Sequence, residues 1–212
     1  MVKAVIFDLD GVIVSTDRLH YEAWKQMADK EHIPFNEQIN HRLRGVSRMA
    51  SLDIILEHAQ KTYTKEEKQA LATYKNNVYV SLLKQLNEKA ILPHVLEVIN
   101  TLKQKGIQIA IGSSSKNTPT ILKQIGLDQT FDAVADGNDI THSKPHPEVF
   151  LKAAEKLDID PLSCLVIEDA ISGIQAAKAA GMKAFGVGDA KHAELIDYAA
   201  DDLRDILHVI DQ

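Results

Sequence analysis

The chain has 212 residues, enough for one large domain or two modest ones, and its 45% hydrophobic and 25% charged residues are typical of a globular protein. A formal net charge of −6 gives no support for nucleic acid or an anionic membrane as the main partner. The lone cysteine, Cys164, excludes an internal disulfide framework. No N-terminal signal or bilayer-length apolar run is visible, so we expect a cytoplasmic protein.

The first predicted element is a buried strand, because Ala4–Phe7 is a short apolar run with β-branched residues. It leads into Asp8-Leu9-Asp10-Gly11, where two carboxylates lie on the same side of an extended chain and Gly11 allows a turn. Charge beside an apolar core is unfavourable unless a cation or hydrogen bonds compensate it. Taken alone, the pair also fits a capping acid followed by a turn acid.

A helical region follows. Residues 15–90 show no convincing strand, and amphipathic helical patterns fill them. A long helix is predicted from Thr64 to about Leu86, with apolar side chains at helical spacing that include Leu71, Tyr74, Val78, Leu82 and Leu83. We therefore predict an all-helical domain at 15–90, inserted into a core formed by residues 1–14 and 91–212.

Helices and strands alternate from Pro93 onward. Strands are predicted at 107–111, 131–135, 164–167 and 183–187, and the helices between them include 118–126, 148–157 and 171–180. Such alternation with short connections predicts an α/β fold, a doubly wound and mainly parallel sheet with helices on both faces. Functional sites in such sheets lie just beyond the carboxyl ends of the strands.

Charged and hydroxyl side chains occupy those strand ends. In chain order they are Asp8 and Asp10, the stretch 113–117, Lys144, and the pair Glu168 and Asp169. Four carboxylates in one cleft cannot all stay ionised without a cation. An all-oxygen ligand set suits a hard ion, and Mg²⁺ is favoured beside phosphate chemistry. Lysines and hydroxyls near a metal are what a transferring phosphoryl group needs.

The candidate nucleophile is a carboxylate. No Walker-type lysine loop or Ser-His-Asp arrangement is apparent, and Cys164 inside a strand indicates a buried core thiol. A carboxylate can form an aspartyl-phosphate, and a second acid two residues away is placed for proton transfer. A phospho-accepting signalling domain of the receiver type would also be doubly wound and Mg²⁺-dependent. That alternative is disfavoured because the acceptor follows the first strand and a large helical insert would cover it.

Four motifs together resemble the haloacid dehalogenase-like phosphotransferases over the whole chain. They are DLDG at 8–11, the serine-rich strand end at 113–115, Lys144-Pro145 and Glu168-Asp169. The resemblance implies a Rossmann-like catalytic core, a mobile helical cap at 15–90 and Mg²⁺ as cofactor. Within the cap, the segments at Thr16, His20-x-x-x-Trp24, 44–48 and Lys75-Asn76 resemble sugar phosphomutases of that family, as does Ser115-Lys116-Asn117 in the core.

The resemblance also implies roles. Asp8 would be the nucleophile and Asp10 the general acid/base, and the Mg²⁺ ligands would be Asp8, the Asp10 backbone carbonyl, Glu168 and Asp169. Ser113, or Ser114 if the strand end slips, would hold the transferring phosphoryl with Lys144. The remaining substrate-binding residues would be Thr16, His20, Trp24, Gly45, Val46, Ser47, Arg48, Lys75, Ser115, Lys116 and Asn117. Ordinary packing for His20 and Trp24, and solvation for Arg48 and Lys75, are the alternatives.

Two activities share this core. Attack of water on the phospho-aspartate gives a phosphatase, whereas attack of a sugar hydroxyl gives a mutase. A mutase must exclude water and needs a second phosphate site for its bisphosphate intermediate, and Arg48 suits bidentate phosphate binding. We favour the mutase, acting as a monomer on a small-molecule sugar phosphate, with a sugar-phosphate phosphatase as the alternative. The other histidines, His142 and His146 among them, form no evident metal-ligand spacing and are expected at the surface.

Overall fold

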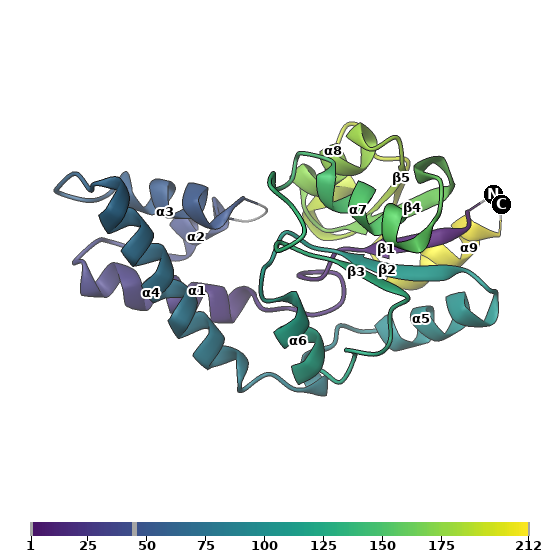
Figure 1. Ribbon diagram of the computed structural model, residues 1–212, viewed down its shortest axis with the longest axis horizontal. Coiled ribbons are helices and arrows are strands. Elements are labelled where there is room, and N and C mark those ends of the chain that lie inside the picture. The colour runs from purple at the N-terminus through teal and green to yellow at the C-terminus, as the bar shows by residue number, and fades with distance from the viewer. Residues whose placement is uncertain (1, 44–45, 212) are drawn as a thin grey trace. The chain divides into compact units, whose positions relative to one another are not determined.

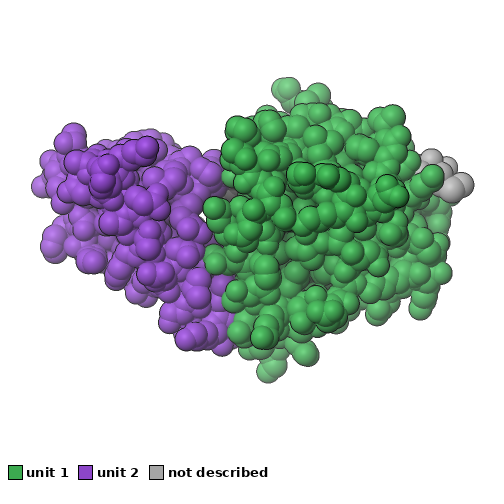
Figure 2. Space-filling view, viewed as in Figure 1, with its two compact units in different colours: residues 1–15, 87–212 green, residues 16–86 purple. Residues whose placement is uncertain are grey.

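The protein is described here by a computed structural model that covers residues 2–43 and 46–211. The chain divides into two compact units, coloured separately in Figure 2. Unit 1 comprises Met1–Ser15 and Asn87–Gln212, and unit 2 comprises Thr16–Leu86. Within the described ranges, none of the helices combines the length and apolar character needed to cross a membrane.

Unit 1 is built on a sheet that, among the described residues, has six strands, each parallel to its neighbours. The strands are β1 (Ala4–Phe7), β2 (Gln108–Gly112), β3 (Ala133–Ala135), β4 (Cys164–Glu168), β5 (Lys183–Gly186) and β6 (Tyr198–Ala199). Their order across the sheet is β3-β2-β1-β4-β5-β6. The chain thus adds strands on one side of β1 as far as β3, and then on the other side of β1 from β4 to β6. The predicted doubly wound parallel sheet is confirmed.

Helices cover both faces of this sheet (Figure 1). They are α5 (Val95–Gln104), α6 (Thr118–Gln124), α7 (Glu148–Leu157), α8 (Ile171–Ala179) and α9 (Ile206–Ile210), with short 3₁₀ helices at Glu88–Ala90, Pro161–Ser163, Gly188–His192 and Leu203–Asp205. Helix α7 packs on β2 and β3, and α8 packs on β4 and β5. Helix α5 contacts β2 and α9.

Side chains that alternate along the strands build the core of unit 1. Ile6 and Val166 belong to the cluster under α7 and α8, whereas their neighbours Phe7 and Ile167 point to the opposite face. All four side chains are fully buried, and each such burial contributes about 1.5–3 kcal/mol. Because both faces of the sheet are covered, charged side chains can leave the strands only at their ends.

The sixth strand lies in the tail after Gly188, where the sequence predicted a strand-to-helix junction at 201–202 but gave no bounds for the strand. β6 has two residues, and it pairs Tyr198 with Phe185 of β5. Asp197 ties this strand to the sheet, because its side chain accepts a hydrogen bond from the backbone N–H of Ala184 at 2.8 Å. A two-residue strand held by backbone pairing carries too little side-chain pattern for its bounds to be predicted.

Unit 2 is helical, and its described residues contain no strand, as the sequence predicted. Its helices are α1 (Asp17–Lys30), α2 (Glu37–His41), α3 (Arg48–Leu56) and α4 (Lys65–Leu83). Helix α4 begins with a capping box: the backbone N–H of Glu67 donates to the Thr64 hydroxyl at 3.2 Å, and the Thr64 N–H donates to the Glu67 carboxylate at 2.7 Å. Unit 2 has a buried core of its own, whose side chains include Trp24, Met27 and Leu52.

Candidate active site

The centre of the candidate site is Asp8, which directly follows β1. Its backbone N–H donates to the carbonyl of Ile167 at 2.9 Å, so strand pairing continues one residue past the end of β1. Because Phe7 pairs with Ile111 on one side and Ile167 on the other, Asp8 lies between the ends of β2 and β4. Only 7% of Asp8 is exposed. The fold therefore holds this carboxylate at the carboxyl edge of the sheet, largely out of water.

Lys144 joins Asp8 to a second buried acid. Its ammonium donates to Asp8 Oδ1 at 2.5 Å and to Glu168 Oε1 at 2.5 Å, and it lies 4.6 Å from the centre of the Phe150 ring. Lys144 and Glu168 are both buried. A buried charge is very unfavourable when it is unpaired, so the ammonium and the two carboxylates compensate one another.

The pKa values reflect this crowding. Burial raises the pKa of Asp8 to about 7; the neighbouring acids add to this effect, and Lys144 partly offsets it. Burial, with the nearby carboxylates, raises the pKa of Asp169 to about 8. Burial alone would lower the pKa of Lys144, but Asp8 and Glu168 outweigh it and raise that pKa above its ordinary value. The cluster therefore favours bound protons on its acids and a positive charge on Lys144.

Asp8, Glu168 and Asp169 could hold a metal ion. Each offers one carboxylate oxygen, and these atoms all lie within 4.8 Å of one another. Asp10 belongs to the same electrostatic group, because its charge contributes to the raised pKa values of Asp8 and Asp169. A donor set made only of carboxylate oxygens suits a hard divalent cation, and a cation there would relieve the repulsion between the acids. The residues thus fit Mg²⁺.

Two glycines leave the space that these acids occupy. Gly11 has a φ of +86°, and a Cβ built on it would lie 2.0 Å from Asp169 Oδ2. Gly173 lies in the first turn of α8, and a Cβ there would lie 1.9 Å from Glu168 Oε1. Any larger residue at either position would push a carboxylate away from the cluster.

The serine-rich loop after β2 contacts the segment that carries Lys144. Ser113 is buried, and its hydroxyl accepts from the Ser115 N–H at 3.2 Å. The Ser114 hydroxyl accepts from the Lys144 N–H at 3.5 Å. Within the same loop, Ser115 accepts from the Asn117 N–H at 3.2 Å, and Lys116 is exposed. The structure therefore brings the predicted hydroxyl group and the predicted lysine to the same edge.

In unit 2, three predicted substrate-binding residues contact Tyr79, and a fourth, Trp24, contacts Lys75. The Tyr79 hydroxyl donates to the Thr16 hydroxyl at 3.0 Å, and the Tyr79 ring stacks on His20 with the centres 4.0 Å apart. The Lys75 ammonium lies 2.7 Å from His20 Nδ1 and 4.7 Å from the ring centres of both Trp24 and Tyr79. Lys75 is buried, so its interpretation as a solvated lysine is wrong.

Sequence reasoning missed Tyr79. The apolar spacing placed Tyr74 and Val78 on the buried face of α4, yet both are only partly buried. The buried face instead follows every fourth residue, through Leu71, Lys75, Tyr79 and Leu83. Apolar and aromatic residues do recur every fourth position on this face, but the charged Lys75 among them breaks the apolar pattern.

The predicted phosphate loop of unit 2 leads into α3. Ser47 caps that helix, because its hydroxyl accepts from the Ala50 N–H at 3.3 Å, and Arg48 is the first helical residue. Burial lowers the pKa of Arg48, and the Tyr79 hydroxyl lies within electrostatic reach of its guanidinium. Val46 is exposed. The prediction for Gly45 falls outside the described residues.

Residues 2–181 match the sequence model of the haloacid dehalogenase-like hydrolases, and the chain belongs to that family. It is 42% identical to the β-phosphoglucomutase of Bacillus subtilis, over 97% of this chain and 94% of the relative. It is 32% identical to a phosphorylated carbohydrates phosphatase of Thermotoga maritima, over 85% and 82%. A crystal structure of β-phosphoglucomutase from Clostridium difficile matches with a TM-score of 0.91 and 38% identity, over 100% and 96%.

Proposed function

We propose that this protein is a Mg²⁺-dependent β-phosphoglucomutase. It interconverts β-D-glucose 1-phosphate and β-D-glucose 6-phosphate through β-D-glucose 1,6-bisphosphate. The observation that carries the proposal is the buried contact of Lys144 with both Asp8 and Glu168 at the carboxyl edge of the sheet. The 42% identity to a β-phosphoglucomutase over 97% of the chain supports the choice of substrate.

In the proposed mechanism, a carboxylate oxygen of Asp8 attacks the phosphorus of one of the two phosphates of β-D-glucose 1,6-bisphosphate. The bond from phosphorus to the sugar oxygen breaks, and Asp10 gives that oxygen a proton. In the other half of the cycle, the free hydroxyl of a bound glucose monophosphate attacks phospho-Asp8 while Asp10 takes its proton. This step forms the bisphosphate again and frees Asp8. Lys144 stabilises the negative charge of the transferring phosphoryl group, with Ser113 beside it.

The metal would be held by Asp8, Glu168 and Asp169, with the backbone carbonyl of Asp10. When bound, Mg²⁺ supplies positive charge to the phosphoryl oxygens. Because burial raises the pKa of Asp8 to about 7, a large part of this nucleophile is protonated near neutral pH when no cation is bound. Additional positive charge beside Asp8 would favour its reactive, ionised form.

We assign recognition of the sugar to unit 2, as a cap over a core formed by residues 1–14 and 91–212. His20, Trp24 and Lys75 would line the sugar pocket with Thr16, and the contacts of these side chains with Tyr79 and with one another support a shared role. Arg48 would bind the phosphate that is not transferred. The backbone at Gly45, Val46 and Ser47, together with Ser115, Lys116 and Asn117, would complete that phosphate site. We also propose that the protein is cytoplasmic and acts as a monomer.

A sugar-phosphate phosphatase is the second candidate. The relatives that favour it include the phosphorylated carbohydrates phosphatase at 32% identity and a fructose-1-phosphate phosphatase of Escherichia coli at 33%. Both candidates use phospho-Asp8, and they differ in whether water or a sugar hydroxyl removes the phosphoryl group.

A primed assay separates the two. The full chain is given β-glucose 1-phosphate, Mg²⁺ and a trace of β-glucose 1,6-bisphosphate, and formation of glucose 6-phosphate and of free phosphate is followed in parallel. A mutase forms glucose 6-phosphate much faster than free phosphate and depends on the primer. Release of phosphate without isomerisation would favour the phosphatase.

The Arg48→Ala variant tests the second phosphate site. It should raise the KM for both glucose phosphates and leave slow hydrolysis of a small ester such as p-nitrophenyl phosphate unchanged. Arg42→Ala is the matched control, because Arg42 is an exposed arginine of the same unit paired with Glu57. Unchanged mutase kinetics in Arg48→Ala would remove this assignment.

A further inference from the structure

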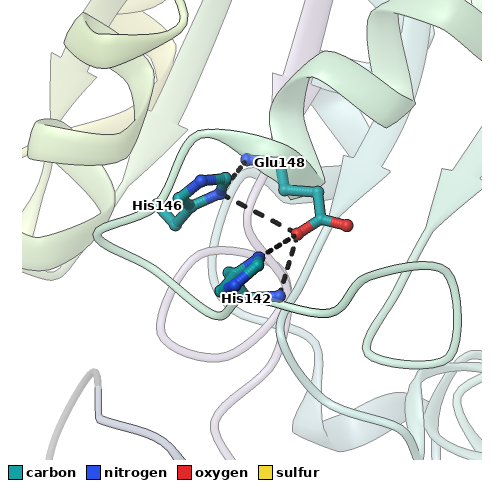
Figure 3. Close-up of side chains that lie close together, drawn as sticks. All are labelled: His142, His146 and Glu148. Carbon is teal, nitrogen blue, oxygen red and sulfur yellow. Dashed lines mark hydrogen bonds and ion pairs between the residues drawn. The ribbon is translucent and has the colours of Figure 1, made fainter.

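A second cluster of potential metal ligands lies outside the acidic site, on the segment that leads into α7 (Figure 3). It consists of His142, His146 and Glu148, whose ligand atoms all lie within 4.8 Å of one another. The Nδ1 atoms of His142 and His146 lie 3.2 Å and 3.8 Å from Glu148 Oε2. The surface position expected for both histidines is confirmed, but the inference that they lack a metal-ligand arrangement is wrong, because the loop folds back on Glu148.

The carboxylate of this cluster is held in place by the backbone. Glu148 Oε1 accepts from the Thr141 N–H at 2.9 Å, and Oε2 accepts from the His142 N–H at 2.8 Å. These two hydrogen bonds lower the pKa of Glu148, so its side chain is a carboxylate. The imidazole of His146 is positioned too, because its Nδ1 accepts from the Glu148 N–H at 3.3 Å. Figure 3 shows the two rings on the side of the loop that faces this carboxylate.

The ligand chemistry differs from that of the acidic site. Imidazole suits Zn²⁺ and similar transition-metal ions, whereas Mg²⁺ strongly prefers oxygen ligands. In a tetrahedral zinc site with bonds of about 2.0–2.2 Å, neighbouring ligand atoms lie somewhat more than 3 Å apart. The distances from Glu148 Oε2 to the two Nδ1 atoms are close to that spacing. Small side-chain movements, in which His146 Nδ1 exchanges its hydrogen bond from the Glu148 N–H for the ion, would complete three-ligand coordination and leave a fourth position for water.

We propose that His142, His146 and Glu148 form a binding site for one Zn²⁺ ion, or a transition-metal ion of similar preference, separate from the Mg²⁺ site. Lys144 lies in the chain between the two histidines. An ion bound here would tie both flanks of the Lys144 segment to the first residue of α7. This inference does not depend on which substrate the acidic site uses.

The test is a titration of the full chain with Zn²⁺ while Mg²⁺ is in excess, read by isothermal titration calorimetry. Co²⁺, followed by its visible absorption, reports the geometry. We expect one ion per chain and a melting temperature that rises with Zn²⁺. The variant His142→Ala/His146→Ala should lose this binding. Loss of either imidazole alone should weaken it by more than the roughly 10-fold to 100-fold that removing an outer-shell partner costs.

His94→Asn is the matched control. His94 Nδ1 also lies 3.2 Å from a carboxylate, that of Glu97, but the pair belongs to no three-ligand cluster in the described part of the chain. Asparagine is chosen because His94 has a φ of +64°. This variant should bind Zn²⁺ as the wild type does. The proposal is overturned if the wild type binds no Zn²⁺, or if the double variant binds it with unchanged stoichiometry and affinity.

Discussion

The ammonium of Lys144 lies 2.5 Å from Asp8 Oδ1, although 136 positions of sequence separate the two residues. One belongs to the first turn after β1 and the other to the segment before α7. Their contact places a permanent positive charge beside the proposed nucleophile, and it lowers the pKa that burial raises. The proposed chemistry depends on this pairing, because the same charge would face the phosphoryl group once it is on Asp8.

Replacing Lys144 with methionine keeps most of the side-chain length and removes its charge. We expect turnover in the primed assay to fall by about 10²-fold to 10³-fold, as for loss of a group that stabilises transition-state charge. The activity that remains should rise at higher pH than in the wild type, because the pKa of Asp8 loses the lowering effect of Lys144. Lys152→Met is the control, since that lysine is an exposed partner of Glu155 on α7. Near-normal turnover in Lys144→Met would contradict the assigned role.

The raised pKa values predict how stability depends on pH. Folded Asp8 and Asp169 keep their protons to about pH 7 and pH 8, whereas their ordinary value is 3.8. Between the ordinary pKa of 3.8 and these raised values, the folded state binds more protons than the unfolded state. The free energy of unfolding therefore falls as pH rises through this range. Urea unfolding in EDTA at pH 5 to 8.5 should show this decline.

The variant Asp8→Asn/Asp169→Asn isolates the contribution of these two groups. Its stability should fall less steeply over the same pH range, and it should exceed that of the wild type most clearly above pH 8. Saturating Mg²⁺ should flatten the wild-type curve in the same way, because a cation favours the ionised acids. Parallel curves for the wild type and the variant would mean that these acids are not perturbed as described.

Gly173→Ala tests the space beside Glu168. In an ordinary helix interior this change would stabilise the protein by up to about 1 kcal/mol. Here the new methyl group would meet the Glu168 carboxylate, so we expect a loss of about 1–3 kcal/mol and reduced turnover. The cost should shrink in a Glu168→Ala background, where the obstacle is absent. A gain in stability from Gly173→Ala in the wild-type background would show that the carboxylate lies elsewhere.

Two changes at Tyr79 separate its hydroxyl from its ring. Tyr79→Phe removes the hydrogen bond to Thr16 and should cost about 0.5–1.5 kcal/mol of stability. Tyr79→Leu also removes the stacking with His20 and the ring below Lys75, so it should cost at least about 1 kcal/mol more and raise the KM for glucose phosphates. Denaturant unfolding and the primed assay measure both. Equal effects of the two variants would mean that the ring positions nothing.

The sheet could be predicted because its main strands are short apolar runs, and some of them pass directly into acidic residues. β4 is an example, since its buried run passes directly into Glu168 and Asp169. The bounds of the short strand β6 could not be predicted, because backbone pairing with β5 creates it and its two side chains carry no pattern. On α4, the sequence predicted the helix and two buried positions, Leu71 and Leu83, but missed Tyr79. The presence of Lys75 in the buried face depends on Trp24, an aromatic neighbour from another helix.

Within the acidic site, the sequence indicated which residues reach the sheet edge, and the structure adds how they pair. Lys144 and Glu168 were expected there for separate reasons, as a phosphate ligand and a metal ligand. Their 2.5 Å contact depends on the path of the loop between β3 and α7, which no local pattern encodes. The path of this loop also brings His142 and His146 to Glu148, and that contact could not be predicted from a local pattern either.

The most direct measurement is the position of the phosphate on the enzyme during turnover. The chain is mixed with Mg²⁺ and β-glucose 1,6-bisphosphate, quenched within one turnover, and its peptides are analysed by mass spectrometry. We expect a phosphoryl group on Asp8 that hydroxylamine removes, and neither phosphoenzyme nor mutase activity in Asp8→Asn. A phosphate on any other residue, or full activity in Asp8→Asn, would contradict the proposed role of Asp8.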